Sequence, residues 1–292
     1  VENARDYITR FGFRREALPD NLSMALGSAS VTPLSMARGY AVFANGGYRV
    51  EPYWLQTVHD QRQRLLYARA RTQRCATCPA LATPARPLDS LFGSDHKPAA
   101  RLRLKQQDQA SSRIEVVEER PRALTGPAVP RYQPRAIEPA VAYMVRSMME
   151  DVIRRGTGRR ARSLGRDDLA GKTGTTNEQH DAWFSGYNSA LVTSVWVGFD
   201  DHQPLGRREL GGRAALPVWI DYMGTALKGV PEHRPQMPVG VAQVWIDPDT
   251  GEIVSREQHP DALRELVHAA ALDNLSDDAK AGEGKTTVDP YE

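Results

Sequence analysis

The residues most able to do chemistry lie at positions 170–177, where the chain reads Ala-Gly-Lys-Thr-Gly-Thr-Thr-Asn. On a β-strand side chains alternate, so Thr173 and Thr175 would direct their hydroxyls to the same side. Two neighbouring hydroxyls beside the Lys172 ammonium suit a carboxylate, which accepts several hydrogen bonds. Gly174 leaves room for a peptide that pairs with the strand, and the backbone N–H of Thr175 would then face a reacting carbonyl oxygen. The spacing therefore predicts a strand that binds a peptide carboxylate and stabilises an oxyanion.

The motif taken alone and its polar neighbours also have simpler explanations. Lys-Thr-Gly is short enough to recur by chance, and without its context it favours a structural strand and turn. His180 and Asp181 are adjacent, and neighbours on a strand point to opposite faces, so they cannot relay a proton through one another. Their side chains are typical of a polar turn.

Composition and the chain ends set broad limits. The 292 residues are 40% hydrophobic and 25% charged, as in ordinary globular domains, and the net charge of +2 argues against a nucleic-acid partner. No apolar stretch approaches the ~18 residues that a membrane-spanning helix needs. The chain begins at Val1 inside what looks like a helix. We therefore expect a fragment, and the lack of an apolar span says nothing about the parent protein.

Residues 1–59 are expected to be ordered, in contrast to residues 60–131. The Thr32-Pro33 pair begins a helix that should end at Gly46-Gly47, and loose alternation over residues 48–58 predicts a strand. Residues 60–131 are basic, rich in Arg and Pro and without periodicity, so they are interpreted as an insertion. Such a basic run is typical of a solvated surface, with a polyanionic surface as the less favoured reading.

The insertion contains the only two cysteines of the chain, Cys75 and Cys78. A zinc site would need two more ligands, and a thioredoxin-like motif would need a βαβ setting. A small surface disulfide is therefore favoured in an oxidising compartment, with free thiols as the alternative. No metal site is predicted.

Residues 132–230 show the clearest periodicity. Apolar residues between Val141 and Ile153 recur at helical spacing, and Gly156 should end that helix. Three strand-like segments follow, and the turn residues Asn188-Ser189 join the last two as a hairpin. The strands are predicted at 168–176, 182–187 and 190–199, before a further helix at 215–227. Helices around hairpin-connected strands predict an α+β fold, in which helices cover an antiparallel sheet.

The remaining C-terminal residues are predicted to be less regular. Residues 231–275 should contain a small hairpin around the Asp249-Thr250-Gly251 turn, and then a surface helix beyond Pro260. Residues 276–292 are polar and are predicted to form a disordered tail.

The neighbours of the motif carry a family resemblance. Lys172 to Asn177 is followed by Asp-Ala-Trp-Phe-Ser-Gly at 181–186 and Trp-Val-Gly-Phe-Asp at 196–200. Together these segments resemble class A penicillin-binding proteins, most nearly the 1A type. Further matches follow the order of that family, at residues 10–13, 25–30, 40–47, 152–158 and 211–217. The resemblance implies a penicillin-binding/β-lactamase-like transpeptidase fold that is incomplete at its N-terminus.

The resemblance also implies where the missing chemistry lies. The family is similar in carrying S-x-x-K, S-x-N and K-T-G motifs in that order, and only the third is present here. The serine nucleophile is therefore expected upstream of Val1, and this chain alone is expected to be inactive. Ser94 to Lys97 fits S-x-x-K, but it lies in a polar insertion and in the wrong order, so coincidence is the better explanation.

By the same resemblance, Lys172 is the catalytic residue of this chain, and Thr173, Gly174, Thr175 and Thr176 bind substrate. Expected partners are peptidoglycan stem peptides, as the D-Ala-D-Ala donor and the amine acceptor, with β-lactams as inhibitors. No metal or other cofactor is implied. A glycosyltransferase domain and a membrane anchor in the parent protein, and a location on the periplasmic side of the bacterial inner membrane, are further implications.

Other functions remain open at this stage. A class A β-lactamase or a D,D-carboxypeptidase shares the K-T-G strand, although the pair Trp183 and Trp196 and residues 211–217 favour the transpeptidase. A non-catalytic module could use the strand to bind peptides without chemistry. An upstream sequence without S-x-x-K would indicate that module.

Overall fold

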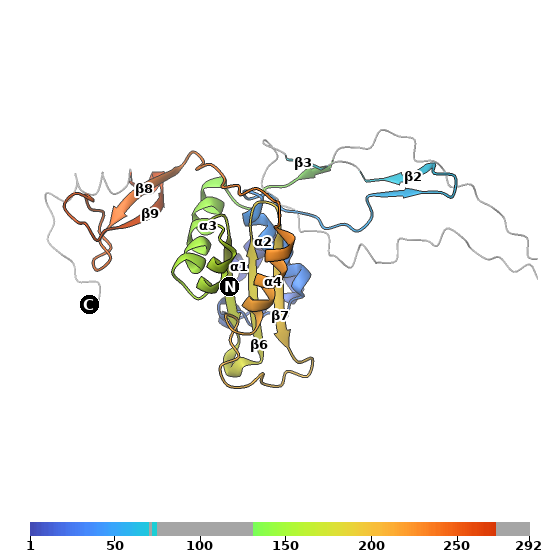
Figure 1. Ribbon diagram of the computed structural model, residues 1–292, viewed down its shortest axis with the longest axis horizontal. Helices are drawn as coiled ribbons and strands as arrows, with labels where there is room; N and C mark the ends of the chain where they lie inside the picture. Colours follow the sequence, from blue (N-terminus) through green and yellow to red (C-terminus); the bar gives the residue numbers. More distant parts are fainter. Residues whose placement is uncertain (70–71, 75–130, 273–292) are drawn as a thin grey trace, which may run out of the picture.

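The computed structural model of the protein describes residues 1–69, 72–74 and 131–272. At its centre lies a three-stranded antiparallel sheet of β5 (Ala170–Thr175), β6 (Asp181–Tyr187) and β7 (Val192–Gly198), in the order β5-β6-β7 (Figure 1). Helices pack on both faces of this sheet. The predicted α+β class, an antiparallel sheet flanked by helices, is confirmed.

The two faces of the sheet contact different helices. The ring of Phe184 lies 5.0 Å from the ring of Trp219 on α4 (Ala215–Ala226). Tyr187, three residues further along β6, points to the other face and lies 6.4 Å from the ring of Tyr40 on α2 (Pro33–Ala44). Met149 of α3 (Pro139–Arg154) belongs to the same cluster as Tyr187. Alternation along β6 therefore sorts the core into two layers.

The ends of α2 follow from its local sequence. The backbone N–H of Ser35 donates to Thr32 Oγ1 at 3.1 Å, and Pro33 lies in the first turn, where a missing N–H has no partner to lose. Beyond the helix, Gly46 and Gly47 adopt positive φ angles of 65° and 94°. A Cβ on Gly47 would lie 2.4 Å from the carbonyl oxygen of Ile137, so glycine is needed where this turn meets the chain before α3.

Shorter elements complete the described chain. The hairpin of β1 (Thr57–His59) and β2 (Leu65–Ala68) and the hairpin of β8 (Val241–Ile246) and β9 (Leu263–His268) lie on either side of the central body (Figure 1). No described helix combines the length and apolar character needed to cross a membrane. The remaining elements are α1 (Glu2–Thr9), η1 (Arg15–Ala17), η2 (Leu22–Leu26), β3 (Thr72–Arg74), β4 (Arg131–Gln133), η4 (Arg159–Leu164) and η5 (Asn177–Gln179).

The strand predicted over residues 48–58 is wrong for most of its length. Tyr48 forms only an isolated bridge with Arg135, and regular pairing begins at β1, which is antiparallel to β2. The sequence alternation was loose, and a strand forms only where a partner strand lies beside it to complete its hydrogen bonds.

The helix predicted beyond Pro260 is wrong for residues 263–268, which form β9, and within the described chain helical structure begins only at residues 269–272. This strand pairs antiparallel with β8 from Val241↔His268 to Ile246↔Leu263. Its apolar residues are spaced as on a helix, but the hydrogen bonds offered by the edge of β8 outweigh that local preference. The predicted turn at residues 249–251 is present. It is closed by the N–H of Asp247, which donates to the carbonyl oxygen of Glu252 at 2.9 Å, and by an isolated bridge between Ile246 and Ile253.

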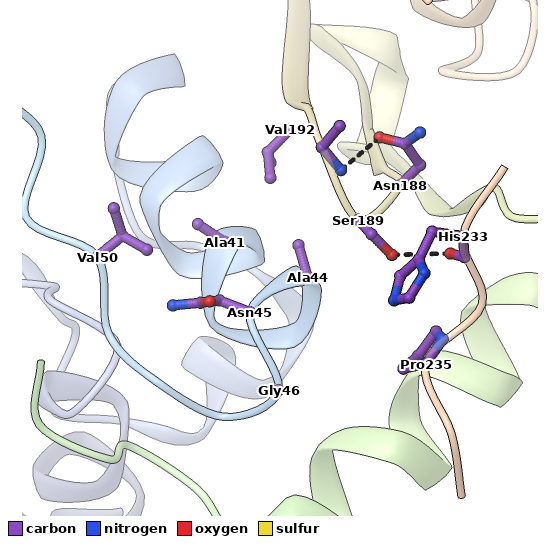
Figure 2. Close-up of a pocket in the computed structure, with 11 residues that line it drawn as sticks. Ala41, Ala44, Asn45, Gly46, Val50, Asn188, Ser189, Val192, His233 and Pro235 are labelled. Atoms are coloured by element: carbon purple, nitrogen blue, oxygen red, sulfur yellow. Dashed lines mark hydrogen bonds between the residues drawn. The ribbon is translucent and has the colours of Figure 1, made fainter. Parts of the chain in front are cut away.

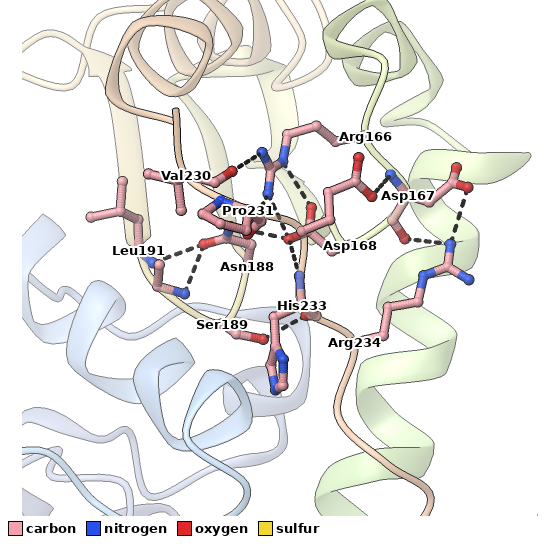
Figure 3. Close-up of polar contacts among 12 residues, drawn as sticks. Arg166, Asp167, Asp168, Asn188, Ser189, Leu191, Val230, Pro231, His233 and Arg234 are labelled. Carbon is pink, nitrogen blue, oxygen red and sulfur yellow. Dashed lines mark hydrogen bonds and ion pairs between the residues drawn. The ribbon is translucent and has the colours of Figure 1, made fainter. Parts of the chain in front are cut away.

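A buried ion pair joins the start of β5 to two distant loops (Figure 3). Asp168 is fully buried and accepts hydrogen bonds from Arg166 Nε at 2.9 Å and Arg166 Nη2 at 2.8 Å. Asn188 Nδ2 also donates to Asp168, at 3.2 Å, as does the backbone N–H of His233 at 3.3 Å. One carboxylate therefore connects β5, the β6–β7 turn and the segment after α4.

The pKa of Asp168 reflects opposing effects. Burial raises it most strongly, but the hydrogen bonds from Arg166, His233 and Asn188 and the charge of Arg166 together bring the pKa below the ordinary value of 3.8. Since the folded-state pKa is the lower one, the ionised carboxylate stabilises the fold above about pH 3.8. This contribution is lost as the pH falls through the folded-state pKa.

We expect Asp168→Asn to lower the free energy of unfolding by about 3 kcal/mol at neutral pH, because Arg166 would lose its buried counter-charge. Thermal unfolding followed by circular dichroism across a pH series measures this deficit, which should shrink in acid. The control is Asp167→Asn, since the Asp167 side chain is 85% exposed and pairs only with Arg234 among charged groups of the described chain. A deficit that does not change with pH would contradict the prediction.

Candidate functional site

Strand β5 places the Lys172–Thr175 motif at an edge of the central sheet. In the described chain β5 pairs only with β6, with Thr175 opposite Ala182. The N–H of Thr176 donates to the carbonyl oxygen of Asp181 at 3.1 Å, so by alternation the N–H of Thr175 points away from β6. As far as the structure describes the chain, the outer edge of β5 therefore offers backbone groups to an added strand or peptide.

Lys172 lies on the face of the sheet that also carries Ser185 and Trp183. Its side chain is exposed, and Nζ donates to the carbonyl oxygen of Thr173 at 2.8 Å. Ser185 lies opposite Lys172 in the register, and the ring centroids of Trp183 and Trp196 are 6.2 Å apart. This face therefore presents an ammonium group next to a pair of indole rings.

Both threonine hydroxyls of the motif have a polar partner in the structure. Thr173 Oγ1 lies 2.8 Å from Thr157 Oγ1, in the turn that follows α3. Thr175 Oγ1 accepts a hydrogen bond from the backbone N–H of Gly211 at 3.0 Å. The two hydroxyls come from alternate residues of one strand, so they share a face as the spacing predicts.

The loop before α4 approaches β5 closely through Gly211. A Cβ at Gly211 would lie 2.3 Å from the carbonyl oxygen of Trp183 and 2.5 Å from that of Gly174. A Cβ at Gly212 would meet looser surroundings, with the carbonyl oxygen of Thr157 at 3.1 Å. Only a residue without a side chain brings this backbone N–H within reach of Thr175.

Thr176 and the residues after it build the turn into β6. The N–H of Asp181 donates to Thr176 Oγ1 at 2.8 Å, so that hydroxyl stabilises the turn. Asp181 Oδ1 accepts from Trp196 Nε1 at 2.8 Å, whereas the His180 ring contacts the carbonyl oxygen of His202. His180 and Asp181 therefore make separate contacts, and Asp181 is the first residue of β6 and not part of the turn.

A cavity of about 500 Å³ lies at the opposite end of the sheet (Figure 2). It opens between the end of α2 and the β6–β7 turn, and is lined by residues including Ala44, Asn45, Ser189 and His233. Asn188, also in the lining, accepts hydrogen bonds from the N–H groups of Ala190 and Leu191. The cavity is remote from Thr175, because the turn end of β6 pairs with the other end of β5.

Several sequence candidates lie outside the described residues. These are Cys75, Cys78, Ser94 and Lys97, so the predicted disulfide and the dismissal of Ser94 stay predictions. Among the residues that the structure describes, no three His, Cys, Asp or Glu side chains gather as a metal-binding group would require.

Sequence reasoning noticed two contributors to this site without assigning them a role. Thr157 and Gly211 both lie in segments that carry the family resemblance, at 152–158 and 211–217. Each is flanked by glycine, which is typical of a close backbone approach. Their contacts with the strand depend on tertiary packing, so spacing along the chain could not reveal them.

Comparison with known proteins agrees with this geometry. Residues 9–214 match the family model of the penicillin binding protein transpeptidase domain. The chain is 44% identical over 278 residues to Penicillin-binding protein 1A of Pseudomonas aeruginosa, covering 91% of this chain and 33% of that protein. It is 41% identical over 241 residues to Penicillin-binding protein 1A of Neisseria lactamica, covering 82% of this chain and 23% of the relative.

A solved structure has a similar fold. The crystal structure of Penicillin-Binding Protein 1A from Haemophilus influenzae has a TM-score of 0.69 to this chain, at 31% sequence identity. The match covers 92% of this chain and 36% of that one. The fold of this chain is thus shared with a protein of the 1A type.

The chain belongs to the penicillin-binding protein transpeptidase family. Its similarity to relatives named Penicillin-binding protein 1A confirms the resemblance read from the residues. The chain spans about a third, or less, of the length of the relatives compared above.

We expect Gly211→Ala to destabilise the protein by about 2 kcal/mol, because the added methyl group overlaps two carbonyl oxygens of the sheet. Gly212→Ala is the matched control, and its cost should be clearly smaller. Thermal unfolding measures both, and hydrogen exchange should show faster exchange in the loop before α4 for Gly211→Ala alone. Equal effects of the two substitutions would contradict the packing of Gly211 against β5.

Proposed function

We propose that this chain is the substrate-binding part of a serine-type D,D-transpeptidase that crosslinks peptidoglycan stem peptides. The observation that supports it most is the outer edge of β5, where the N–H of Thr175 points away from β6 beside the exposed Lys172. The hydroxyls of Thr173 and Thr175 lie on the same strand. This set suits a peptide that ends in a carboxylate.

The reaction proposed for the parent protein proceeds in two acyl transfers. A serine upstream of Val1 attacks the peptide carbonyl of a D-Ala-D-Ala terminus, and the N–H of Thr175 donates to the resulting oxyanion. Cleavage of the C–N bond releases D-alanine, whose amine takes a proton, and leaves an acyl-serine ester. The amine of a second stem peptide then attacks this ester, which forms the crosslink and regenerates the serine.

Each site residue has a role in this proposal. Lys172 supplies positive charge to the proton-transfer network, and Thr173 and Thr175 bind the terminal carboxylate. Gly174 leaves the strand unobstructed, so a peptide can lie along it. Thr176 shapes the end of the strand through its contact with Asp181. β-Lactams would bind the same groups as the donor and remain on the serine.

Two alternatives use the same strand. A D,D-carboxypeptidase or β-lactamase would pass the acyl group to water, and a non-catalytic module would bind the peptide without chemistry. The transpeptidase is favoured because relatives of the 1A type match over most of this chain.

The remaining parts of the parent protein follow the same proposal. We propose an upstream glycosyltransferase domain and membrane anchor, with the transpeptidase on the periplasmic side of the inner membrane. Residues 60–131 would form a basic insertion that carries a small surface disulfide between Cys75 and Cys78. Residues 1–59 and 132–230 would form the transpeptidase portion, followed by a C-terminal region at 231–275 and a tail at 276–292.

The experiment that tests this function maps the attachment of a β-lactam to the full-length protein by mass spectrometry. One adduct on a serine upstream of Val1, within S-x-x-K, is the expected result. No adduct would favour the non-catalytic module. An adduct on Ser94 would identify the nucleophile inside the insertion and overturn the present assignment.

We expect Lys172→Ala in the full-length protein to slow acylation by a β-lactam about 100-fold or more, because the developing negative charge would lose its nearest cation on this strand. Quench-flow or competition labelling measures the rate. The control is Lys228→Ala, which removes another exposed lysine just after α4. Unchanged acylation in Lys172→Ala, with a normal melting temperature, would refute the role of this strand.

A further inference from the structure

Thr157 lies within hydrogen-bonding distance of the proposed carboxylate site, although it belongs to neither β5 nor the motif. Its Oγ1 is 2.8 Å from Thr173 Oγ1, across the edge of the sheet. We propose that Thr157 is a positioning residue, whose hydroxyl orients Thr173 to donate its proton to the carboxylate of the substrate. This inference rests on the function proposed above and extends it to a residue outside the motif.

The turn that carries Thr157 contacts both α3 and the loop before α4. The N–H of Gly158 donates to the carbonyl oxygen of Val152 at 2.9 Å, which folds the turn back onto α3. A Cβ on Gly156 would lie 2.8 Å from Val152 Cα, and a Cβ on Gly212 would lie 3.1 Å from the carbonyl oxygen of Thr157. These contacts with α3 and with the loop before α4 fix the position of Thr157 relative to β5.

Hydroxyl chemistry explains what this contact achieves. A hydroxyl has one proton to donate and two lone pairs, whereas an ionised carboxylate only accepts. If Thr173 donates its proton to a carboxylate, its contact with Thr157 requires Thr157 to be the donor. The chain of hydrogen bonds then runs from Thr157 through Thr173 to the ligand, and each bond polarises the next.

Thr175 provides an internal comparison that supports this direction. Its Oγ1 accepts from the backbone N–H of Gly211, a group that can only donate. One lone pair of Thr175 is thereby occupied, and its proton remains for a ligand. In the proposed arrangement Thr157 donates a hydrogen bond to Thr173, as the N–H of Gly211 donates one to Thr175. Thr173 and Thr175, the two proposed donors to the carboxylate, would therefore each accept a hydrogen bond from another group of the protein.

Thr157 is exposed, so its hydroxyl can be removed without opening a core cavity. Thr157→Val preserves the branched shape and removes the donor, while Thr157→Ser keeps the hydroxyl and removes a methyl group. The matched control is Thr193→Val, which removes a β7 hydroxyl that donates to Met223 Sδ. Melting temperatures of all three variants report any general effect on folding.

The test compares two ligands on the full-length protein: benzylpenicillin, which carries the carboxylate, and its neutral methyl ester. Thr157→Val should lower the second-order rate constant of acylation by benzylpenicillin about tenfold, and that by the ester less than about twofold. Thr157→Ser should restore most of the rate with benzylpenicillin, and Thr193→Val should leave both rates unchanged.

Other outcomes overturn the inference in distinguishable ways. Equal loss with both ligands would show that Thr157 only supports the structure. Wild-type acylation rates in Thr157→Val would show that Thr173 does not need a hydrogen bond from Thr157. If the wild-type protein reacts with neither ligand, the proposed transpeptidase function fails, and this inference fails with it.

Discussion

The pairing of β5 with β6 is the interaction on which the rest of the site depends. Its unbroken register from Ala170↔Tyr187 to Thr175↔Ala182 decides which backbone groups are used within the sheet and which point to the outer edge. The same register sets Lys172 on one face and both threonine hydroxyls on the other. A slip of one residue would exchange these faces and turn the N–H of Thr175 into the sheet.

Contacts at both ends hold β5 in place and leave its outer edge open within the described chain. One end is anchored by the buried Asp168 and its four hydrogen bonds, and the other is held where Thr175 accepts from Gly211. An open strand edge invites unwanted pairing with other chains. Here the edge is short and carries a lysine, and both features limit such pairing.

Local sequence patterns predicted the helices α2 and α3 but not the strand β9. The spacing of apolar residues and the Thr32-Pro33 start signal located α2 and α3, because helix ends are set by neighbouring residues. The helix predicted beyond Pro260 was misplaced, because residues 263–268 form β9 where β8 offers them a partner. Strand formation depends on distant residues, so local propensity is a weaker guide to it.

By itself the sequence determined the family, the antiparallel class of sheet and the segment that carries Lys172, Thr173 and Thr175. These depend on residue type and short-range spacing, which a motif preserves. Only the tertiary structure decided that Thr157 contacts the hydroxyl of Thr173 and that Gly211 contacts the hydroxyl of Thr175. It also decided that the N–H of Thr175 points away from β6. Such contacts join residues 16 and 36 positions apart, because loops after α3 and before α4 close over one strand edge.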